Sequence, residues 1–182
     1  RVAAGSDTMS NSATNILTDA FGPGGMIFDL PVDGGAHIYA GTLVSQLTAT
    51  GALTAYSTSS TDVCVGVAQH EADNTSGSDG DKRCRVETRR LYAFANGADS
   101  DAFSEAVLIG SLVYGTDDHT VAKTSNSQAR TPVGFFYGME SDGKVRVLVD
   151  PALARLVLTL QTLTNSPATA DALRDGIVAA FG

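Results

Sequence analysis

Hydrophobic and polar residues alternate with a period of two through most of the chain between residues 26 and 150. Val63, Val65 and Val67 alternate with small residues, and over residues 145–149 valine alternates with arginine and leucine. This alternation is typical of strands that bury one face and leave the other in water.

Stretches rich in turn-forming residues separate these runs. Residues 73–81 and 116–119 combine Asp with Gly, Asn, Ser or Thr, which stabilise tight loops. The spacing of runs and turns therefore predicts many short strands, arranged as a sandwich or a small barrel.

A weak internal echo runs through the strand region. Residues 41–44 precede residues 65–67 by about the distance that separates residues 110–113 from residues 133–135. Each half then passes through an Asp/Gly turn into a strand that alternates valine with basic residues. Two related β units would explain the echo, and chance similarity among strands rich in glycine and valine is the alternative.

The two ends of the chain follow other patterns. Residues 1–25 are rich in Ser, Thr, Asn, Ala and Gly, and we expect a flexible arm with at most a short helical turn at residues 13–21. We divide the chain into this arm, a β domain over residues 26–150 and a helical tail over residues 151–182.

The tail begins where the period changes from two to between three and four. Asp150 is a candidate N-cap and Pro151 fits the first helical position, so we expect a helix. Its apolar positions are Leu153, Leu156, Val157, Leu160, Leu163 and Thr164. The alternative is a strand, because Leu156, Leu158 and Leu160 would line one side of it.

A second amphipathic helix is predicted over residues 169–181, after a break at residues 165–167. Leu173, Ile177 and Phe181 lie on one of its faces together with Val178. We expect this stripe to pack on a sister subunit.

Net charge and apolar run length exclude two classes of partner. The 182 residues contain 12 Lys and Arg against 20 Asp and Glu, which gives a net charge of −8. A protein that binds the phosphates of duplex nucleic acid is therefore not expected, and we predict no nucleic-acid partner.

The longest strongly apolar run, residues 152–163, is shorter than the roughly 20 residues that a membrane span needs. We therefore expect a soluble protein without a membrane partner; synthesis in the cytoplasm of a bacterial host is implied only by the family resemblance given below.

A near match to a phosphate-binding loop occurs at residues 138–145. Val145 stands where that motif has a hydroxyl residue for magnesium, Glu140 and Asp142 would repel phosphate, and a strand follows rather than a helix. We interpret the segment as a hairpin loop.

Metal ligands do not fall into a familiar spacing. His37, His70 and His119 stand far apart without a second His or a Cys pair nearby, so we expect histidines in loops or at strand ends and no metal. Asp73, Asp79 and Asp81 could surround calcium, but their spacing is not that of an EF-hand. We interpret them as turn carboxylates.

Nucleophilic catalysis has no candidate residue. The sequence has no Gly-x-Ser-x-Gly elbow, and its Ser and Thr residues lie in loops without a nearby His. We predict no catalytic residue, no cofactor and no enzyme activity. Cys64 and Cys84 are either free thiols or a cross-strand disulfide.

One dense basic cluster interrupts the acidic chain. On a strand, Arg83, Arg85, Glu87 and Arg89 would share one face, with Arg90 next to them. Such a face can pair with carboxylates of a neighbouring molecule, or it can be solvated. We take four arginines as candidate interface residues: Arg83, Arg85, Arg89 and Arg90.

Together, a set of strand and turn motifs resembles a family of tailed-bacteriophage capsid decoration (cement) proteins. In chain order the motifs are 38–44 (IYAGTLV), 65–68 (VGVA), 73–77 (DNTSG), 80–82 (GDK), 85–86 (RV), 92–96 (YAFAN), 113–123 (VYGTDDHTVAK), 132–134 (PVG) and 142–147 (DGKVRV). Their order and spacing cover about residues 26–150, and the arm and the tail lie outside the match. In relatives a glycine usually follows the basic strand, whereas residues 88–91 here are Thr-Arg-Arg-Leu.

The resemblance implies a compact small β-barrel or β-tulip-like sandwich that sits on the outer surface of a phage head. It implies a structural virion protein that clamps neighbouring major capsid proteins and assembles as a homotrimer. We expect the arm to add a strand to a neighbouring sheet on the capsid. The alternative function is a phage surface module that binds host glycans or a receptor, although the chain has no Trp for a sugar platform.

Overall fold

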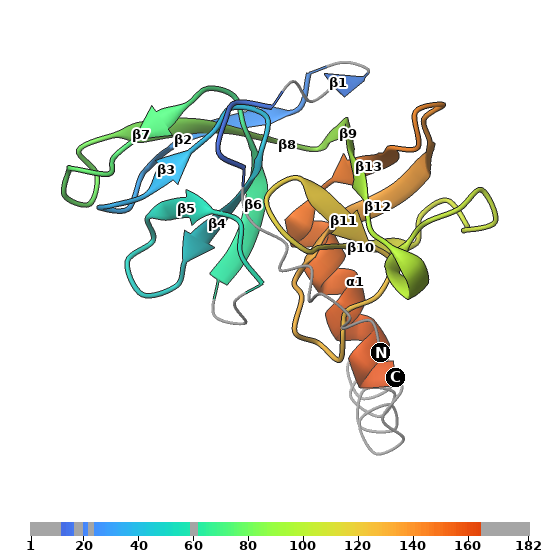
Figure 1. The fold of residues 1–182 in the computed structure, drawn as a ribbon. Coiled ribbons are helices and arrows are strands. Elements are labelled where there is room, and N and C mark those ends of the chain that lie inside the picture. The colour runs from blue at the N-terminus through green and yellow to red at the C-terminus, as the bar shows by residue number, and fades with distance from the viewer. Residues whose placement is uncertain (1–11, 17–19, 22–23, 59–61, 165–182) are drawn as a thin grey trace, which may run out of the picture.

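The computed structural model describes residues 12–16, 20–21, 24–58 and 62–164 (Figure 1). These residues form a mainly β structure with one C-terminal α-helix, so the predicted fold class is confirmed. In Figure 1 the strands of the first half lie on one side and those of the second half on the other, and α1 extends away from both. Within the described residues, no helix combines the length and hydrophobicity needed to cross a bilayer.

The second half of the chain closes into a five-stranded barrel. Its hydrogen-bonded order is β9-β11-β10-β12-β13, and β13 pairs again with β9. The pairing of β9 with β11 is parallel and the other pairings are antiparallel. The bounds are β9 Arg90–Asn96, β10 Leu112–Gly115, β11 Thr120–Ala122, β12 Pro132–Met139 and β13 Val145–Val149, and the 3-10 turn η1 covers Asp99–Asp101 between β9 and β10.

The first half forms a five-stranded sheet in the order β2-β8-β6-β4-β5. Its outer strands also meet, because Val32 forms a parallel bridge to Leu53 and the Asp33 amide donates to the Leu53 carbonyl at 2.9 Å. The bounds are β2 Met26–Pro31, β4 Leu43–Leu47, β5 Leu53–Ala55, β6 Asp62–Ala68 and β8 Arg83–Thr88. A small extra pair joins β3 (His37–Ile38) to β7 (Ala72–Asp73).

The two halves repeat the same pairing pattern. In each, the first strand pairs with the last, and the second pairs with both the third and the fourth. The register shifts at the same step in both, between Val44 and Ser45 on β4 and between Val113 and Tyr114 on β10. The segments that carry the sequence echo lie on these equivalent strands.

A glycine occupies the equivalent position in each half where two strands approach closely. A Cβ atom on Gly66 would lie 2.5 Å from the Glu87 carbonyl oxygen, and one on Gly134 would lie 2.1 Å from that of Leu148. Both distances are well below van der Waals contact, so any side chain there would push the strands apart. The repeated glycine therefore has a packing cause.

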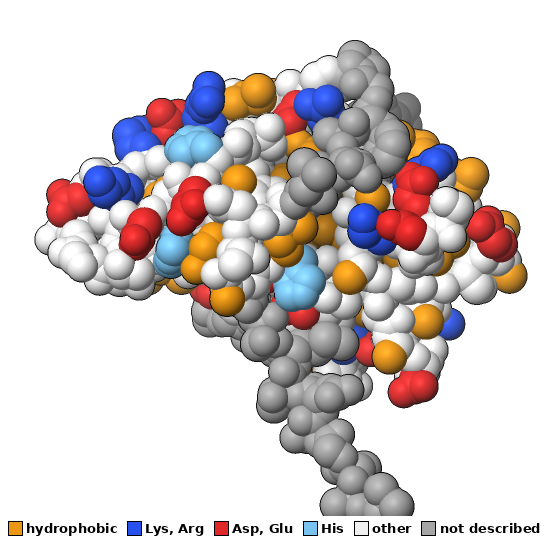
Figure 2. All heavy atoms as spheres, turned by 45° about the horizontal axis from the view of Figure 1, so that its top comes forward, with side chains coloured by type: hydrophobic (Ala, Val, Ile, Leu, Met, Phe, Trp, Pro, Cys, Tyr) orange, Lys and Arg blue, Asp and Glu red, His pale blue; other side chains and the backbone are white. Residues whose placement is uncertain are grey.

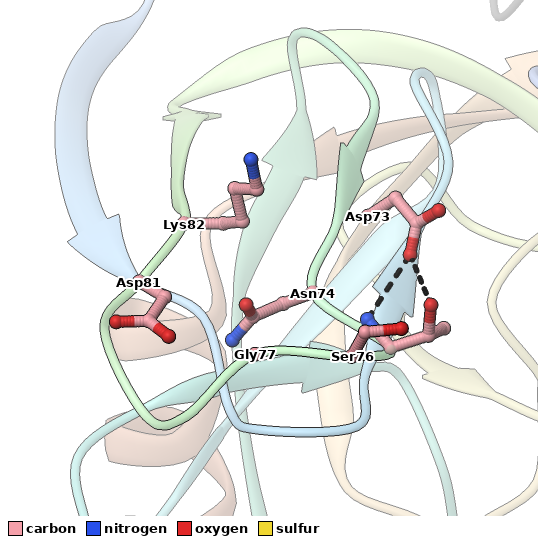
Figure 3. A pocket seen from close by; sticks show the side chains of 7 residues that line it. Asp73, Asn74, Ser76, Gly77, Asp81 and Lys82 are labelled. Atoms are coloured by element: carbon pink, nitrogen blue, oxygen red, sulfur yellow. Dashed lines mark hydrogen bonds between the residues drawn. The ribbon is translucent and has the colours of Figure 1, made fainter.

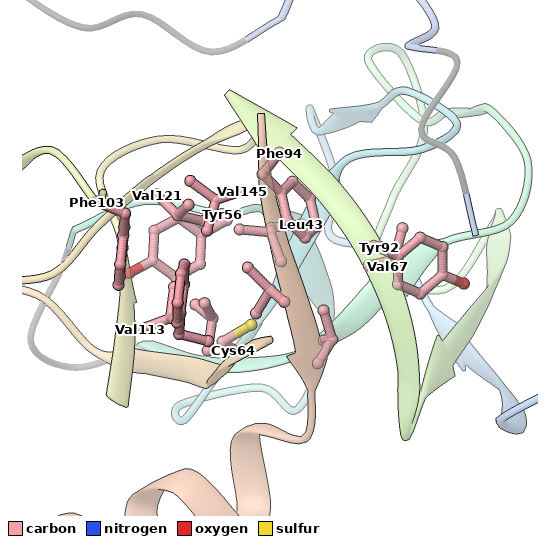
Figure 4. Packing of buried hydrophobic residues seen from close by; sticks show 14 residues of the cluster. Leu43, Tyr56, Cys64, Val67, Tyr92, Phe94, Phe103, Val113, Val121 and Val145 are labelled. Carbon is pink, nitrogen blue, oxygen red and sulfur yellow. The ribbon is translucent and has the colours of Figure 1, made fainter. Parts of the chain in front are cut away.

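Hydrophobic residues from both halves share one core (Figure 4). Leu43, Tyr56 and Cys64 of the first half are buried against the strands of the second-half barrel. The Tyr56 hydroxyl donates to the carbonyl oxygen of Gly115 or of Thr131, each at 3.2 Å. A second buried cluster lies inside the first half. The shared core makes the two halves one packed body.

Helix α1 (Pro151–Thr164) starts where the sequence predicts, so the alternative of a strand is wrong. The Asp150 carboxylate accepts a hydrogen bond from the Leu153 amide at 3.1 Å, which is the expected N-cap. The helix packs on β12 and β6, with Ala154 completely buried.

Three leucines of this helix point away from the sheet. Leu153, Leu156 and Leu160 are 45%, 54% and 45% exposed. Pro151 and Ala154 face the sheet instead, because small side chains let a helix lie close to a β surface.

The described part of residues 13–21, where we expect at most a short helical turn, contains no helix. Residues 20–21 form strand β1 (Ala20–Phe21), which pairs with β9 of the same chain. The Ile16 amide donates to the Ala40 carbonyl at 2.9 Å, and the Ala40 amide donates to the Asn15 side chain at 2.9 Å. These backbone groups bond to the body of the protein and therefore cannot close a helical turn.

Candidate functional site

The basic cluster begins on strand β8, where two arginines point into solvent. Arg83 and Arg85 are exposed, while Cys84 and Val86 alternate with them into the core. The Arg83 guanidinium contacts Asp29 on the adjacent strand, with 3.2 Å to the carboxylate and 2.6 Å to the backbone oxygen. Arg83 is therefore partly neutralised within the chain.

The basic face does not continue to Arg89 as predicted. Arg89 lies in the turn between β8 and β9 with a φ of 59°, and its guanidinium is 3.3 Å from the Asp150 carboxylate. This φ is left-handed, a conformation that glycine adopts without strain and that a residue with a side chain adopts less readily. The strand alternation ends at Thr88, so Arg89 leaves the face of Arg83 and Arg85.

Glu87 is also displaced from the predicted solvent face, since it is only 1% exposed. Its carboxylate accepts hydrogen bonds from the Tyr92 hydroxyl at 2.5 Å, the Gly25 amide at 2.7 Å and the Arg90 guanidinium at 3.1 Å. Gln69 in turn donates to the Tyr92 hydroxyl at 2.9 Å. Three segments therefore meet at this one carboxylate: the segment at Gly25, the end of β8 and the start of β9.

Burial raises the pKa of Glu87, but the hydrogen bonds from Tyr92, Gly25 and Arg90 outweigh it and hold the pKa below its ordinary value. Burial and the Glu87 charge together raise the pKa of Tyr92. Arg90 is thus an internal counterion at the junction of the two halves.

Of the four predicted interface arginines, three are exposed and one, Arg90, is half-buried against Glu87. Among the exposed three, Arg83 and Arg89 each form an ion pair within the chain. Leu173, Ile177 and Phe181 lie outside the described residues. Figure 2 shows that charged side chains of both signs are interspersed over one face of the molecule, with hydrophobic side chains between them.

The loop after β7 surrounds a shallow hollow of about 350 Å³ lined by residues 73–77, Asp81 and Lys82 (Figure 3). Its carboxylates cap turns. Asp73 accepts from the Thr75 amide at 3.0 Å and hydroxyl at 2.7 Å, and Asp81 accepts from the Ser78 amide at 2.8 Å.

The third carboxylate of this loop links it to another loop, since Asp79 accepts a hydrogen bond from the Gly34 amide at 2.8 Å. In the part of the chain that the structure describes, Asp73, Asp79 and Asp81 do not converge on one point. This arrangement favours turn carboxylates over a calcium site.

Asp117, Asp118 and His119 bring their ligand atoms within 4.8 Å of one another, a proximity that the sequence analysis missed. Asp117 accepts from the Thr120 amide at 2.6 Å, and Asp118 accepts from the Ser12 amide at 2.9 Å and lies 2.7 Å from His119 Nδ1. A cation would have to displace these donors. The cluster therefore acts as a capped turn that also holds Ser12.

The segment that nearly matches a phosphate-binding loop is part of a hairpin. Residues 140–144 form the turn between β12 and β13, as the hairpin interpretation predicts. His37 contacts Glu71 at 2.9 Å at the end of a short strand.

Cys64 and Cys84 are free, and burial raises their pKa values to about 12 and about 11. Neither thiol is a reactive nucleophile at neutral pH.

The most exposed large hydrophobic side chains in the described ranges stand on the loop before β10. Leu108 is 79% exposed and Ile109 is 69% exposed. The Ser111 amide donates to the Leu108 carbonyl at 3.1 Å, and the Gly110 amide donates to the Phe136 carbonyl at 2.8 Å. These two hydrogen bonds hold the backbone of the loop, and the side chains of Leu108 and Ile109 lie in solvent. No periodicity signals this pair, so the sequence analysis did not select it.

No family model, curated protein or solved structure matches this chain.

Proposed function

We propose that this protein is a structural virion component that binds the outer surface of a bacteriophage head and cements neighbouring major capsid proteins. The observation that carries the proposal is the exposed Leu108–Ile109 pair on a backbone that is fixed before binding. Apolar side chains on a rigid surface are typical of protein–protein contacts, because covering them removes water at little ordering cost.

The sequence resemblance supports this proposal independently. Its motifs fall on strands and turns that build both halves, among them β6, β9 and the β10–β11 hairpin. The two halves share a core, so a contact made by one half is mechanically coupled to the other. A body of this kind can bridge two capsid subunits without a hinge between its contact points.

Co-sedimentation with expanded phage heads assembled without this protein tests the proposal. We expect Leu108→Asp and Ile109→Asp each to weaken binding by roughly tenfold or more, about 1.4 kcal/mol, because a carboxylate would be buried in an apolar contact. The matched control is Ala106→Asp, which adds the same charge at an exposed position of the same loop.

Wild-type levels of binding by the Leu108→Asp and Ile109→Asp variants would remove this loop from the contact. If the wild-type protein does not bind heads at all, the cement function is wrong. A glycan array would then test the host-surface alternative.

A further inference from the structure

Strand β1 covers an edge of β9 in the second half of the molecule (Figure 1). β9 pairs with β13 on one side, and on its other side Phe21 lies opposite Leu91 and Ala20 lies opposite Tyr92. β11 continues this second side further along β9. A strand with a partner on each side offers no open edge to another molecule.

The repeat between the two halves identifies the matching edge in the first half. The two close-approach glycines of the repeat lie against the carbonyl groups of Glu87 and Leu148. Glu87 pairs with Ile27 on β2, and Leu148 pairs with Leu91 on β9. Ile27 is therefore the counterpart of Leu91, one of the residues that β1 covers.

The hydrogen bonds that close each half give the same alignment. The Asp33 amide donates to a carbonyl of β5 at 2.9 Å, and the Gly97 amide donates to a carbonyl of β11 at 2.8 Å. Ile27 precedes Asp33 by the same number of residues as Leu91 precedes Gly97. The two edges thus match in register as well as in topology.

The edge of β2 carries no second strand in the part of the chain that the structure describes. Over Met26–Pro31, β2 pairs with β8 alone. Successive amides of a strand point to opposite sides, and the Asp33 amide points away from β8, so the amides of Ile27 and Asp29 also point outward. The side chains of Ile27 and Met26 are 59% and 52% exposed. The first half therefore has an open, apolar edge where the second half has β1.

The surroundings of this edge indicate what can occupy it. The Asp29 carboxylate lies 3.2 Å from the Arg83 guanidinium, so its charge is balanced within the chain. The neighbouring outward residue of β2 is Ile27. An extended apolar segment fits this edge better than a charged one, because an unpaired charge would be buried beside Ile27.

The described parts of the N-terminal arm are bonded elsewhere. The Ile16 amide donates to the Ala40 carbonyl, and the Ser12 amide donates to the Asp118 carboxylate. Residues 20–21 pair with β9. None of these segments lies on β2, so the occupant of its edge has to come from another source.

We propose that the open edge of β2 binds an extended apolar strand of the major capsid protein, which pairs antiparallel to β2 as β1 pairs with β9. Strand addition of this kind takes its affinity from main-chain hydrogen bonds and its specificity from alternate side chains. The added strand places an apolar side chain opposite Ile27, as Phe21 lies opposite Leu91. This inference rests on the proposed function and gives the first half a contact of its own, besides the Leu108–Ile109 contact of the second half.

Amide hydrogen exchange followed by mass spectrometry tests the pairing, on the free protein and on the protein bound to expanded heads. The amides of Ile27 and Asp29 should exchange rapidly in the free protein, because they point outward. On heads they should exchange roughly tenfold more slowly or less, because the added strand supplies carbonyl acceptors.

Ile27→Pro removes one of these amides without touching the pairing with β8, and proline is tolerated where the missing amide faces outward from an edge strand. We expect this variant to bind heads roughly tenfold more weakly. The control is Ser141→Pro in the exposed turn after β12, where the Gly143 amide donates to the Glu140 carbonyl at 2.9 Å. Ser141 holds the second turn position, which accepts proline, so this variant should bind heads as the wild type does.

The outcomes separate this inference from the cement function. If the wild-type protein binds heads but the exchange at Ile27 and Asp29 is unchanged, or if a folded Ile27→Pro variant binds as tightly as the wild type, the strand pairing is wrong and the cement function stands. Amides already protected in the free protein would show that this chain or a second copy covers the edge, which also overturns the proposal. Absence of wild-type binding overturns both. Far-UV circular dichroism verifies the fold of each variant, and the exchange result decides if Ile27→Pro does not fold.

Discussion

At the scale of single residues, Glu87 is a buried carboxylate that connects separate parts of the chain. It joins the segment at Gly25, the end of β8 and the start of β9 through one buried carboxylate. Removing a partner from a buried ion pair costs more than the pair contributes, because the remaining charge stays buried.

Glu87→Gln should reduce the free energy of unfolding at pH 7 by about 3 kcal/mol, since Arg90 would lose its counterion. The folded-state pKa of Glu87 lies below its ordinary value of 4.5. The ionised carboxylate therefore contributes stability above pH 4.5, and this contribution is lost as the pH falls through the folded-state pKa. Urea unfolding at pH 7 and at pH 3.5 should show a smaller difference between variant and wild type at the lower pH.

The control for this measurement is Glu140→Gln, which breaks an ion pair with Arg146 on the surface hairpin. Exposed ion pairs contribute little to stability, so a smaller loss is expected. An equal loss for Glu87→Gln at both pH values would show that its charge is not the source of the stability.

Single residues also mark the limit of sequence-based prediction. The alternation around Cys84 and Val86 correctly predicts which side of β8 is buried. The same alternation places Glu87 in solvent and fails, because Tyr92 and the segment at Gly25 cover it from other parts of the chain. The prediction that Arg89 shares this face is wrong for a related reason. Arg89 lies in a turn with a left-handed φ, and the turn ends the strand alternation before it reaches this residue.

At the scale of elements, local signals predicted that α1 forms and where it begins. Asp150 and Pro151 define the start of the helix through backbone hydrogen bonding, which is local chemistry. Which face is buried depends on how closely the helix approaches β12 and β6, and a periodic pattern cannot report that. Leu153, Leu156 and Leu160 are exposed rather than packed on the β domain.

Asp150→Ala should lower the melting temperature and reduce stability by about 1 kcal/mol, because the Leu153 amide loses its N-cap acceptor. Asp150→Asn keeps a capping oxygen and should cost clearly less, since Asn and Asp cap about equally well. If Asp150→Asn is as destabilising as Asp150→Ala, the ion pair with Arg89 rather than the cap stabilises this helix start.

At the scale of the whole molecule, two halves with the same strand pairing form one body around a shared core. The sequence echo at residues 41–44 and 110–113 pointed to equivalent strands, and the two close-approach glycines, Gly66 and Gly134, lie at equivalent positions. The closure of the second half into a barrel depends on β9 pairing with both β11 and β13, which no local pattern contains. Leu108 and Ile109 are exposed on the loop before β10 of this body.

The number of copies bound per phage head at saturation tests the cement function most directly. Increasing amounts of the purified protein would be sedimented with expanded heads that lack it, and the bound copies counted against the major capsid protein. We expect saturation at a multiple of the threefold sites of the shell. Binding that never saturates, or no binding at all, would contradict the account.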